Sequence, residues 1–548
     1  MEFTKYNHSI EEKKIYDFWE KNNLFKPKSK KLKKTFSIVI PPPNITGKLH
    51  MGHALNNSLQ DVLIRYYRMN GYETLWQPGT DHAGIATQAI VEKNLAKENI
   101  NKNDIGRDKF LKKVWEWKAE SGGLILEQLK KIGCSCDWSR SRFTMDDQMS
   151  KAVTKVFVAL YNKKLIYKDK KLVNWDTKLQ TAISDLEVVQ NEVQSQLYYI
   201  NYAIADSIEK ITIATTRPET MMGDTAIAVN PKDERFKNFV GKFAIIPVVN
   251  RKIKIIEDYY ADPEQGTGAV KITPAHDFND YDVGKRNKLE IINILEKDGK
   301  INKNGIKSYV GLDRFEARKK IISELKSLNL LEKIESIKNK VPYGDRSNTI
   351  IEPLLTEQWF VNAKYLSKKT IEVVKKKKTS FYPENWEKTF FQWMNKIEPW
   401  CISRQIWWGH RIPAWYDEKK NIYVAENEKK ALSLAIKKNK NKKIKLKQET
   451  DVLDTWFSSA LWPFATLGWP SKTKELKKFY PTSVLVTGFD IIFFWVARML
   501  MMGNYFQKVT PFKKVYVHAL VRDEKGQKMS KSKGNVLDPL VLSEKYGT

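Results

Sequence analysis

A single segment, residues 35–69, constrains the fold of this chain more than any other. Residues 35–40 are rich in β-branched and aromatic side chains and predict a buried strand. A rigid Pro41-Pro42-Pro43-Asn44 turn and a short loop follow, and residues 50–69 predict a helix. A strand that leads through a loop into a helix is half of a βαβ unit. The sequence therefore predicts an α/β fold with a doubly wound parallel, Rossmann-like sheet.

Two clusters of imidazole and basic side chains stand far apart in the sequence. His50 and His53 lie at the opening of the predicted helix, where their spacing places both rings on the side that an anion approaches. The run Lys528-Met529-Ser530-Lys531-Ser532 predicts a loop that can close on a phosphate group. Either cluster alone is typical of packing or of a solvated surface. Together they indicate one site for a phosphorylated substrate.

The separation of the two clusters predicts an insertion. Residues 53 and 528 are 475 positions apart, whereas a nucleotide-binding fold needs roughly 150–200 residues. Alternating β-rich segments and turns place the insertion at residues 196–340. We therefore expect four parts: an N-terminal extension, the first half of the core with connecting segments, a β-rich barrel-like insertion, and connecting segments with the second half of the core (residues 1–34, 35–195, 196–340 and 341–548).

Composition narrows the class of protein. The net charge of +31 favours a polyanionic partner, although lysine runs of this kind are also typical of a solvated surface. Three cysteines, Cys134, Cys136 and Cys401, are too few for a disulfide framework and indicate a reducing, cytoplasmic compartment. Their spacing does not suit a zinc site. No stretch approaches the roughly 20 apolar residues of a membrane span, so we expect no membrane partner.

The two clusters resemble the HIGH and KMSKS motifs of the class I aminoacyl-tRNA synthetases. Further stretches narrow the resemblance to the valyl-tRNA synthetases and cover essentially the whole chain: residues 76–88, 136–140, 172–175, 400–410, 451–462 and 488–495. The resemblance implies a ligase that activates valine with ATP and Mg²⁺ and transfers the valyl group from valyl-adenylate to tRNA(Val). It also implies catalytic and ATP-binding roles for His50, His53, Lys528 and Lys531.

The resemblance assigns the rest of this site. Asp81, beside Asn44, would hold the ammonium group of valine, and helix capping is the alternative for Asp81. A rigid apolar wall would admit valine and exclude isoleucine; it consists of Pro42, Trp456 and Ile491, each of which could also be an ordinary core residue. The implied adenosine contacts are Gly488, Asp490 and His518. A packed histidine explains His518 nearly as well.

The predicted insertion carries a second set of polar residues. Threonine is nearly isosteric with valine, and an apolar pocket rejects an added hydroxyl poorly, a limit known for valyl-tRNA synthetases themselves. The resemblance implies hydrolytic editing of threonyl-tRNA(Val), in which Asp280 holds the ammonium group. The other implied editing residues, which shape the pocket and orient water, are Thr215, Thr216, Arg217 and Asp277. Without the resemblance, Thr- and Gly-rich turns are typical of simple strand connections.

The chain departs from the family pattern in two respects. Residues 175–178 and 343–346 carry no cysteine where some members bind zinc, so we expect no structural zinc and no other metal site. The sequence ends sixteen residues beyond Ser532, so we expect it to lack the helical anticodon-binding domain of the family. We expect a monomer.

Two alternative functions stay open. An isoleucine-specific enzyme is disfavoured by residues 80–88 and 451–462. A non-catalytic tRNA-binding or deacylating module is disfavoured by the intact histidine and lysine clusters. Amino-acid-dependent exchange of pyrophosphate into ATP distinguishes these alternatives from a valine enzyme.

Overall fold

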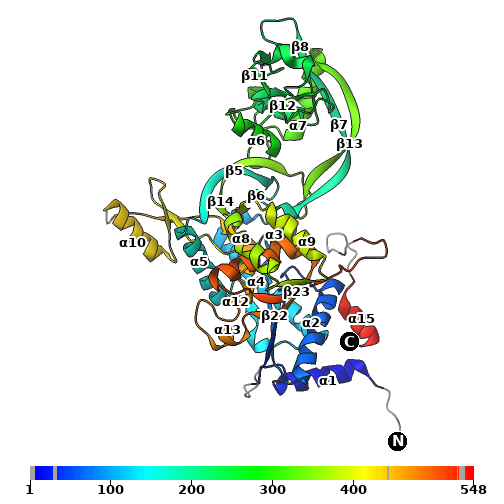
Figure 1. The fold of residues 1–548 in the computed structure, drawn as a ribbon, viewed down its shortest axis with the longest axis vertical. Helices are drawn as coiled ribbons and strands as arrows, with labels where there is room; N and C mark the ends of the chain where they lie inside the picture. Colours follow the sequence, from blue (N-terminus) through cyan, green and yellow to red (C-terminus); the bar gives the residue numbers. More distant parts are fainter. Residues whose placement is uncertain (1–5, 29–33, 441–442, 528, 530–536) are drawn as a thin grey trace. The chain divides into compact units, whose positions relative to one another are not determined.

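The computed structural model describes residues 6–28, 34–440, 443–527, 529 and 537–548, and the chain divides into two compact units (Figure 1). The first, here called the core unit, comprises Met1–Tyr167 and Trp359–Thr548. The second, the inserted unit, is Lys168–Gln358. Strands β5 (Ile166–Asp176) and β14 (Glu352–Val361) carry the chain from one unit to the other. Each unit has an apolar core of its own.

Parallel strands form the centre of the core unit. β1 (Thr35–Val39) pairs with β2 (Glu73–Gln77), and β23 (Phe512–His518) pairs with both β22 (Thr482–Gly488) and β15 (Ser380–Tyr382). The backbone N–H of Ser37 donates to Ser483 Oγ at 3.0 Å, which brings β1 beside β22. The predicted α/β fold with a parallel sheet is therefore confirmed.

Helices from distant parts of the sequence cover this sheet. Helices α2 (Met51–Met69), α5 (Asp147–Asn162), α8 (Ala363–Lys375) and α14 (Arg498–Phe506) contribute buried side chains to the same apolar cluster as β1, β22 and β23. The other helices of the core unit are α1 (His8–Lys21), α3 (Gly84–Lys97), α4 (Lys102–Lys131), α9 (Trp386–Asn395), α10 (Glu428–Asn439), α11 (Thr455–Ser459), α12 (Trp462–Ala465), α13 (Lys474–Phe479) and α15 (Pro539–Tyr546).

Short elements complete the core unit. The remaining strands are β3 (Gly79–Thr80), β4 (Arg142–Phe143), β16 (Trp400–Cys401), β17 (Ser403–Arg404), β18 (Ala414–Tyr416), β19 (Ile422–Val424), β20 (Lys447–Gln448) and β21 (Val452–Leu453). Single turns η1 (Trp138–Arg140), η6 (Phe489–Ile491) and the π-helical η7 (Ile492–Ala497) lie between them. By length and composition, one described helical stretch could cross a membrane, Phe489–Phe506, and 67% of it is buried inside the protein. A core helix of that composition meets the same criteria.

The inserted unit is built on a curled β-sheet with the strand order β12-β9-β11-β10-β7-β13, in which β8 also pairs with β7. The long strands β7 (Val188–Ile204) and β13 (Leu331–Gly344) run antiparallel side by side (Figure 1). They cross the predicted limits at residues 196 and 340, and the division into domains at those positions stays a prediction. The other elements are β6 (Thr181–Ala182), β8 (Lys210–Thr215), β9 (Ala226–Val229), β10 (Phe243–Ile245), β11 (Lys252–Glu257), β12 (Ala269–Ile272), α6 (Phe278–Arg286), α7 (Arg314–Ser327), η2 (Asp185–Glu187), η3 (Pro218–Gly223), η4 (Glu234–Phe239) and η5 (Lys307–Tyr309).

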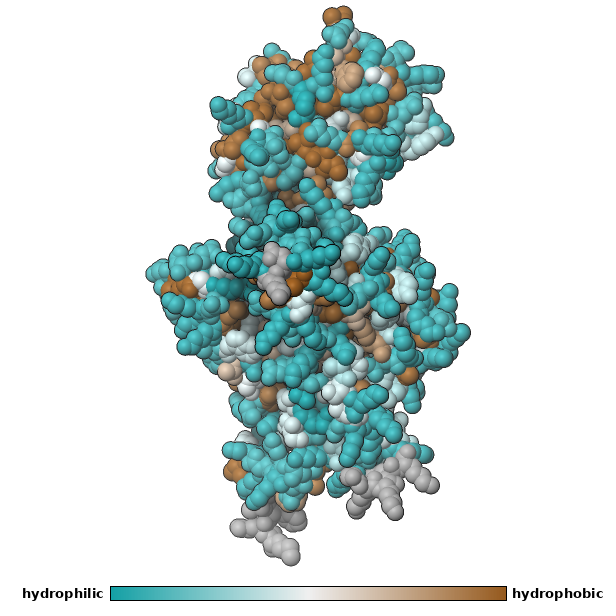
Figure 2. All heavy atoms as spheres, turned by 90° about the vertical axis from the view of Figure 1, so that its left-hand side faces the viewer, coloured by the Kyte–Doolittle hydropathy of each residue, from teal (hydrophilic) through white to brown (hydrophobic). Residues whose placement is uncertain are grey.

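The hydrophilic character of the surface agrees with the high proportion of charged residues in the sequence. Hydrophilic residues cover most of the face drawn in Figure 2, and apolar residues form separate areas between them. Charged residues make up 29% of the chain, which is enough to keep such a surface solvated.

The close packing around Gly79 gives a testable consequence. A Cβ atom at Gly79 would lie 2.5 Å from Trp462 Cη2 and would also collide with the carbonyl oxygen of Arg142. We expect Gly79→Ala to lower the free energy of unfolding by about 1–3 kcal/mol, because the extra methyl overpacks the core. Urea unfolding followed by tryptophan fluorescence measures the change.

The matched control is Gly123→Ala in α4, where the added Cβ would enter open space, with no atom from outside the local helix backbone within 4 Å. That change is expected to raise stability by up to roughly 1 kcal/mol through helix propensity. An unfolding free energy for Gly79→Ala equal to that of the parent would contradict the packing described.

Candidate functional site

Two histidines cap the first turn of α2. His50 Nδ1 accepts from the backbone N–H of Gly52 at 3.1 Å, and His53 Nδ1 accepts from the backbone N–H of His50 at 3.2 Å. A ring nitrogen that accepts a hydrogen bond from a backbone N–H carries no hydrogen, so the hydrogen of each neutral ring lies on Nε2. The ring centroids are 3.9 Å apart. Two Nε2–H donors are thus held together at a helix N-terminus, where anions are favoured.

Gly52 makes this arrangement possible. A Cβ atom there would lie 2.8 Å from His50 Cε1 and 3.0 Å from His50 Nδ1. The ring of His50 therefore occupies the volume that any other residue at position 52 would need.

The C-terminal part of the core unit returns to the same place. Lys528 and Lys531 lie outside the described residues. Met529 is buried, and the carbonyl oxygen of Leu537 accepts from the backbone N–H of Met51 at 3.2 Å. A described residue six positions after Lys531 therefore contacts the first residue of α2.

Asp81 is a buried carboxylate beside the loop that follows β1. Its Oδ1 accepts from the backbone N–H of Ala83 at 2.7 Å, and its Oδ2 accepts a hydrogen bond from the Ser459 hydroxyl. Burial raises the pKa of Asp81 to about 6, although both hydrogen bonds oppose the shift. The neighbouring His82 does not neutralise it, because burial lowers the pKa of His82 well below its usual range. Within the part of the chain that the structure describes, no lysine or arginine forms an ion pair with Asp81, although a buried carboxylate needs such compensation.

The alternative role of Asp81 as a helix cap is limited. It bonds to the backbone of Ala83, the N-cap residue of α3, and that helix has no side-chain cap. The backbone of Asp81 pairs with the loop after β1, where its N–H donates to the carbonyl of Pro43 at 2.9 Å and its carbonyl accepts from the N–H of Ile45 at 3.1 Å. The side chain of Asn44, between them, is exposed.

Helix α11 lies against Asp81 through Ser459. Besides the Ser459 contact, Trp495 Nε1 donates to the carbonyl of Ser459 at 3.1 Å, and Trp462 Nε1 donates to the carbonyl of Ile40 at 2.9 Å. The first bond holds α11, which carries Trp456, against η7, and the second holds the start of α12 against the end of β1. The predicted wall residues Pro42, Trp456 and Ile491 are each half-buried. They follow β1, belong to α11 and follow β22, elements that converge at one edge of the sheet.

The predicted adenosine residues stand at the same carboxyl edge. Gly488 ends β22 opposite His518, which ends β23. A Cβ atom at Gly488 would lie 2.7 Å from Asp490 Oδ1, so the absence of a side chain lets this carboxylate fold back over the strand end. His518 lies 2.9 Å from Asn56 Nδ2 through its Nε2 and 2.8 Å from the carbonyl of Ala519 through its Nδ1. Both ring nitrogens of His518 are thus engaged within the protein.

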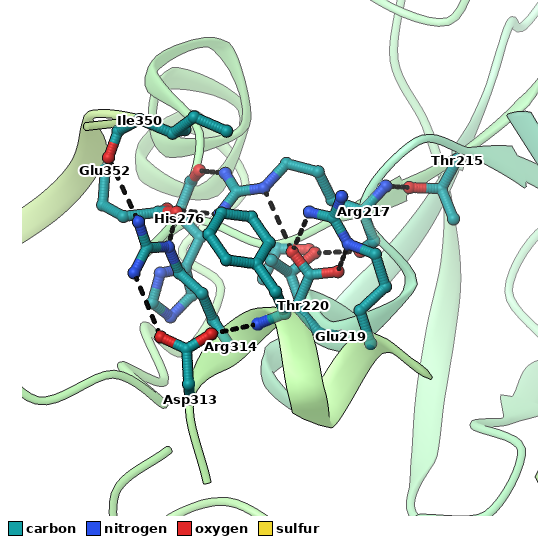
Figure 3. Close-up of polar contacts among 12 residues, drawn as sticks. Thr215, Arg217, Glu219, Thr220, His276, Asp313, Arg314, Ile350 and Glu352 are labelled. Atoms are coloured by element: carbon teal, nitrogen blue, oxygen red, sulfur yellow. Dashed lines mark hydrogen bonds and ion pairs between the residues drawn. The ribbon is translucent and has the colours of Figure 1, made fainter. Parts of the chain in front are cut away.

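A second polar centre lies in the inserted unit around Arg217 (Figure 3). Arg217 Nη1 donates to the carbonyl of His276 at 3.0 Å, and its Nη2 pairs with the carboxylate of Glu352. Burial alone would lower the pKa of Arg217, but Glu352 and Glu219 outweigh it and raise that pKa. The backbone N–H of Arg217 donates to Thr215 Oγ1 at 3.1 Å. Arg217 is therefore charged, and hydrogen bonds hold both its guanidinium group and its backbone N–H.

The negative charge of the neighbouring Glu219 is balanced by an ion pair with Arg318. Arg318 Nε and Nη2 each donate to Glu219 at 2.7 Å in a bidentate pair. Burial alone would raise the pKa of Glu219, but Arg318 holds it below its usual range. Thr216 and Arg318 also line a polar pocket of about 320 Å³ together with Gln194, Ser195, Gln196, Tyr198 and Ser336.

The predicted editing aspartates belong to the same centre. Asp277 is exposed and caps α6 by accepting from the N–H groups of Asn279 and Asp280 at 2.8 and 3.1 Å. Asp280 is buried and accepts from the N–H of Thr273 at 2.8 Å. Burial raises the pKa of Asp280 to about 7, although the charge of Lys271 opposes the shift. The carbonyl of His276 joins this segment to Arg217.

Several residues of both centres were not predicted. Ser459 carried no distinguishing sequence signal, because its partner Asp81 is 378 positions away. Lys271 lies in β12 and donates to Asp224 at 3.0 Å, and Asp224 also accepts from Tyr202 at 2.9 Å. Among the described residues, no group of three or more His, Cys, Asp or Glu side chains could hold a metal ion.

Comparisons with known proteins agree with this architecture. The family model "tRNA synthetases class I (I, L, M and V)" matches residues 14–548. Valine–tRNA ligase of Pelagibacter ubique is 70% identical over 542 residues, covering 99% of this chain and 62% of that protein. Valine–tRNA ligase of Caulobacter vibrioides is 56% identical, and the match covers 98% of this chain and 61% of that protein. The chain thus spans about three fifths of these relatives.

A solved structure supports the fold. The leucyl-tRNA synthetase of Agrobacterium radiobacter K84, solved in a ternary complex, gives a TM-score of 0.53 at 18% identity and covers 99% of this chain and 71% of that chain. The family is shown by the family model, whose match to nearly the whole sequence means that the chain belongs to the class I aminoacyl-tRNA synthetases.

Proposed function

We propose that this chain activates valine with ATP and forms part of a valine–tRNA ligase. The convergence of three groups at one edge of the parallel sheet carries the proposal: the capped histidine pair of α2, the buried Asp81, and Gly488 with Asp490 at the end of β22. Its relatives of 70% and 56% identity are valine–tRNA ligases. Transfer to tRNA(Val) accords with the net charge of +31.

The chemistry follows from charge and hydrogen-bond donors. The carboxylate of valine is already a nucleophile at neutral pH, so it attacks the α-phosphorus of ATP without a general base, and pyrophosphate leaves. The Nε2–H groups of His50 and His53 donate to phosphate oxygens as charge moves onto them. Lys528 and Lys531 neutralise the leaving pyrophosphate, and the Mg²⁺ that enters with ATP shares the charge.

The amino acid is held by Asp81. A buried carboxylate without a cationic neighbour gains most from an ammonium ligand, because the ligand supplies the missing charge. Pro42, Trp456 and Ile491 form the apolar wall around the valine side chain. Gly488 and Asp490 contact the ribose of the nucleotide.

The inserted unit is proposed to hydrolyse threonyl-tRNA(Val). Asp280, buried and with a pKa of about 7, binds the ammonium group of the misplaced threonine. Arg217, Thr215, Thr216 and Asp277 shape the site and orient water. Its hydrogen-bond network is separate from that of the valine site, so each can be inactivated alone.

Substitution of Asp81 tests the valine site. We expect Asp81→Asn to reduce kcat/KM for valine in ATP–pyrophosphate exchange by roughly 100-fold or more, because a neutral amide cannot pair with the ammonium group in a buried site. KM for ATP changes little, since Asp81 does not contact the nucleotide. Isoleucine tested in parallel distinguishes the two amino-acid specificities. Exchange at the parental rate would reject the assigned role of Asp81.

The pH dependence of exchange provides an independent test. Asp81 has a pKa of about 6, so in the empty site it is neutral below that pH and cannot attract the ammonium group. We expect kcat/KM for valine to fall by about tenfold for each pH unit below about 6 and to level off above it. KM for ATP in the same series serves as the control for general acid damage. A flat profile across pH 6 would contradict this role.

Two substitutions separate the proposed activities. We expect Asp280→Asn to slow hydrolysis of threonyl-tRNA(Val) by roughly 10- to 100-fold while leaving valine-dependent exchange intact. Lys531→Ala is expected to do the reverse, because it removes charge stabilisation of the leaving pyrophosphate alone. Equal loss of both activities in either variant would refute the division into two independent sites.

A further inference from the structure

A line of buried polar side chains joins β2 to the proposed adenosine edge. Trp76 Nε1 donates to Gln60 Oε1 at 3.0 Å, and Gln60 Nε2 donates to Asn56 Oδ1 at 2.5 Å. Asn56 Nδ2 continues the line to His518 Nε2 at 2.9 Å. Trp76 and Gln60 are completely buried, and Asn56 is 9% exposed. Buried amides of this kind persist only when their donors and acceptors are matched.

The orientation of each amide is fixed by a partner that can act in one way only. An indole N–H can only donate, so Gln60 turns its oxygen to Trp76 and its nitrogen to Asn56. A backbone carbonyl can only accept, and Asn56 Nδ2 also donates to the carbonyl of Val486 at 3.3 Å. Both amides therefore have one orientation, and Asn56 presents an N–H group to His518.

This orientation determines the tautomer of His518. Its Nε2 faces the Asn56 amide nitrogen, which can only donate, so Nε2 carries no hydrogen. Its Nδ1 faces the carbonyl of Ala519 at 2.8 Å, which can only accept, so Nδ1 carries the hydrogen. In the opposite tautomer, Nε2–H would face the N–H donor of Asn56, and the bare Nδ1 would face the carbonyl acceptor of Ala519.

We propose that Asn56, supported by Gln60 and Trp76, is a positioning residue of the nucleotide site that holds His518 as the Nδ1–H tautomer. With both nitrogens engaged, His518 meets the adenosine through its ring carbons and not through a ring nitrogen. The same bond fixes the carbonyl of Ala519, the first residue of the segment that leads to Lys528. This inference rests on the proposed function for the meaning of the site, and on geometry alone for the tautomer.

The experiment uses the whole chain labelled with ¹⁵N-histidine and examined by NMR without ATP. His518→Gln identifies the signals of His518 by their loss. In the parent protein we expect Nδ1 to bear the hydrogen and Nε2 to be bare. In Asn56→Asp the carboxylate offers only acceptors, so we expect Nε2 to gain a hydrogen. KM for ATP in valine-dependent exchange should rise about tenfold with KM for valine within about twofold, because the nucleotide edge is displaced.

The matched control is Asn504→Asp in α14, which makes the same chemical change at a residue that is 6% exposed and outside this line. We expect it to leave the His518 signals and KM for ATP unchanged, even if it lowers the melting temperature. A hydrogen on Nε2 in the parent protein would overturn the proposal, and that measurement does not depend on the folding of any variant. An unchanged tautomer and KM for ATP in folded Asn56→Asp would overturn it too. Absence of valine-dependent exchange in the parent would instead reject the proposed function, and the His518 spectrum would still decide the tautomer.

Discussion

The core unit depends on one long-range contact, the meeting of β1 with β22. Ser37 and Ser483, which join these strands, are 446 positions apart. Because all strands of the sheet run parallel, their carboxyl ends share one edge. The histidine pair and Asp81 follow the N-terminal strands, whereas Gly488 and Asp490 follow β22. The contact between β1 and β22 brings these two groups of residues to the same edge, and the bond from Asn56 Nδ2 to the carbonyl of Val486 adds a second link between them.

Such a contact tolerates a large insertion for a physical reason. The entropy of closing a loop grows only slowly with its length, so a long connection costs little more than a short one. The condition is that the inserted chain buries its own apolar residues. The inserted unit meets this condition with a separate core that includes Ile200, Tyr202, Ile213 and Ile255.

The buried carboxylates Glu219, Asp81 and Asp280 differ in their neighbours. Glu219 is paired with Arg318, and its pKa is lowered. Asp81 and Asp280 are also buried, but their pKa values are raised, because backbone and hydroxyl donors or a nearby lysine only partly compensate for burial. The first arrangement is complete without a ligand and stabilises the fold. The second leaves a negative charge without full compensation, which an ammonium group can balance, and these two aspartates are the ammonium ligands of the two proposed sites.

The sequence predicted the elements whose signals are local. The strand at residues 35–40 and the helix at 50–69 correspond to β1 and α2 within one residue at each end. Partners that meet only in three dimensions were not predicted. In the sequence, Ser459 is an ordinary serine of a short helix, and only the structure shows its contact with Asp81. Lys271 is likewise one polar residue of an alternating strand, and only the structure shows its pairing with Asp224. The roles of Asp277 and Asp280 came from the family resemblance and not from their spacing.

Helix α2 shows why some polar residues of an amphipathic helix are buried. His53, Asn56 and Gln60 are spaced by three and four residues and so lie along one stripe of the helix. A helix of this size normally buries apolar residues on such a stripe. Along the helix axis, His53 and Asn56, the partner of His518, are separated by about 4.5 Å at 1.5 Å per residue. Because the helix is rigid, it fixes the spacing between the imidazole donors at one end and the ring of His518 at the other. The polar side chains supply the hydrogen-bonding atoms that orient both imidazole groups, which apolar residues in the same positions could not do.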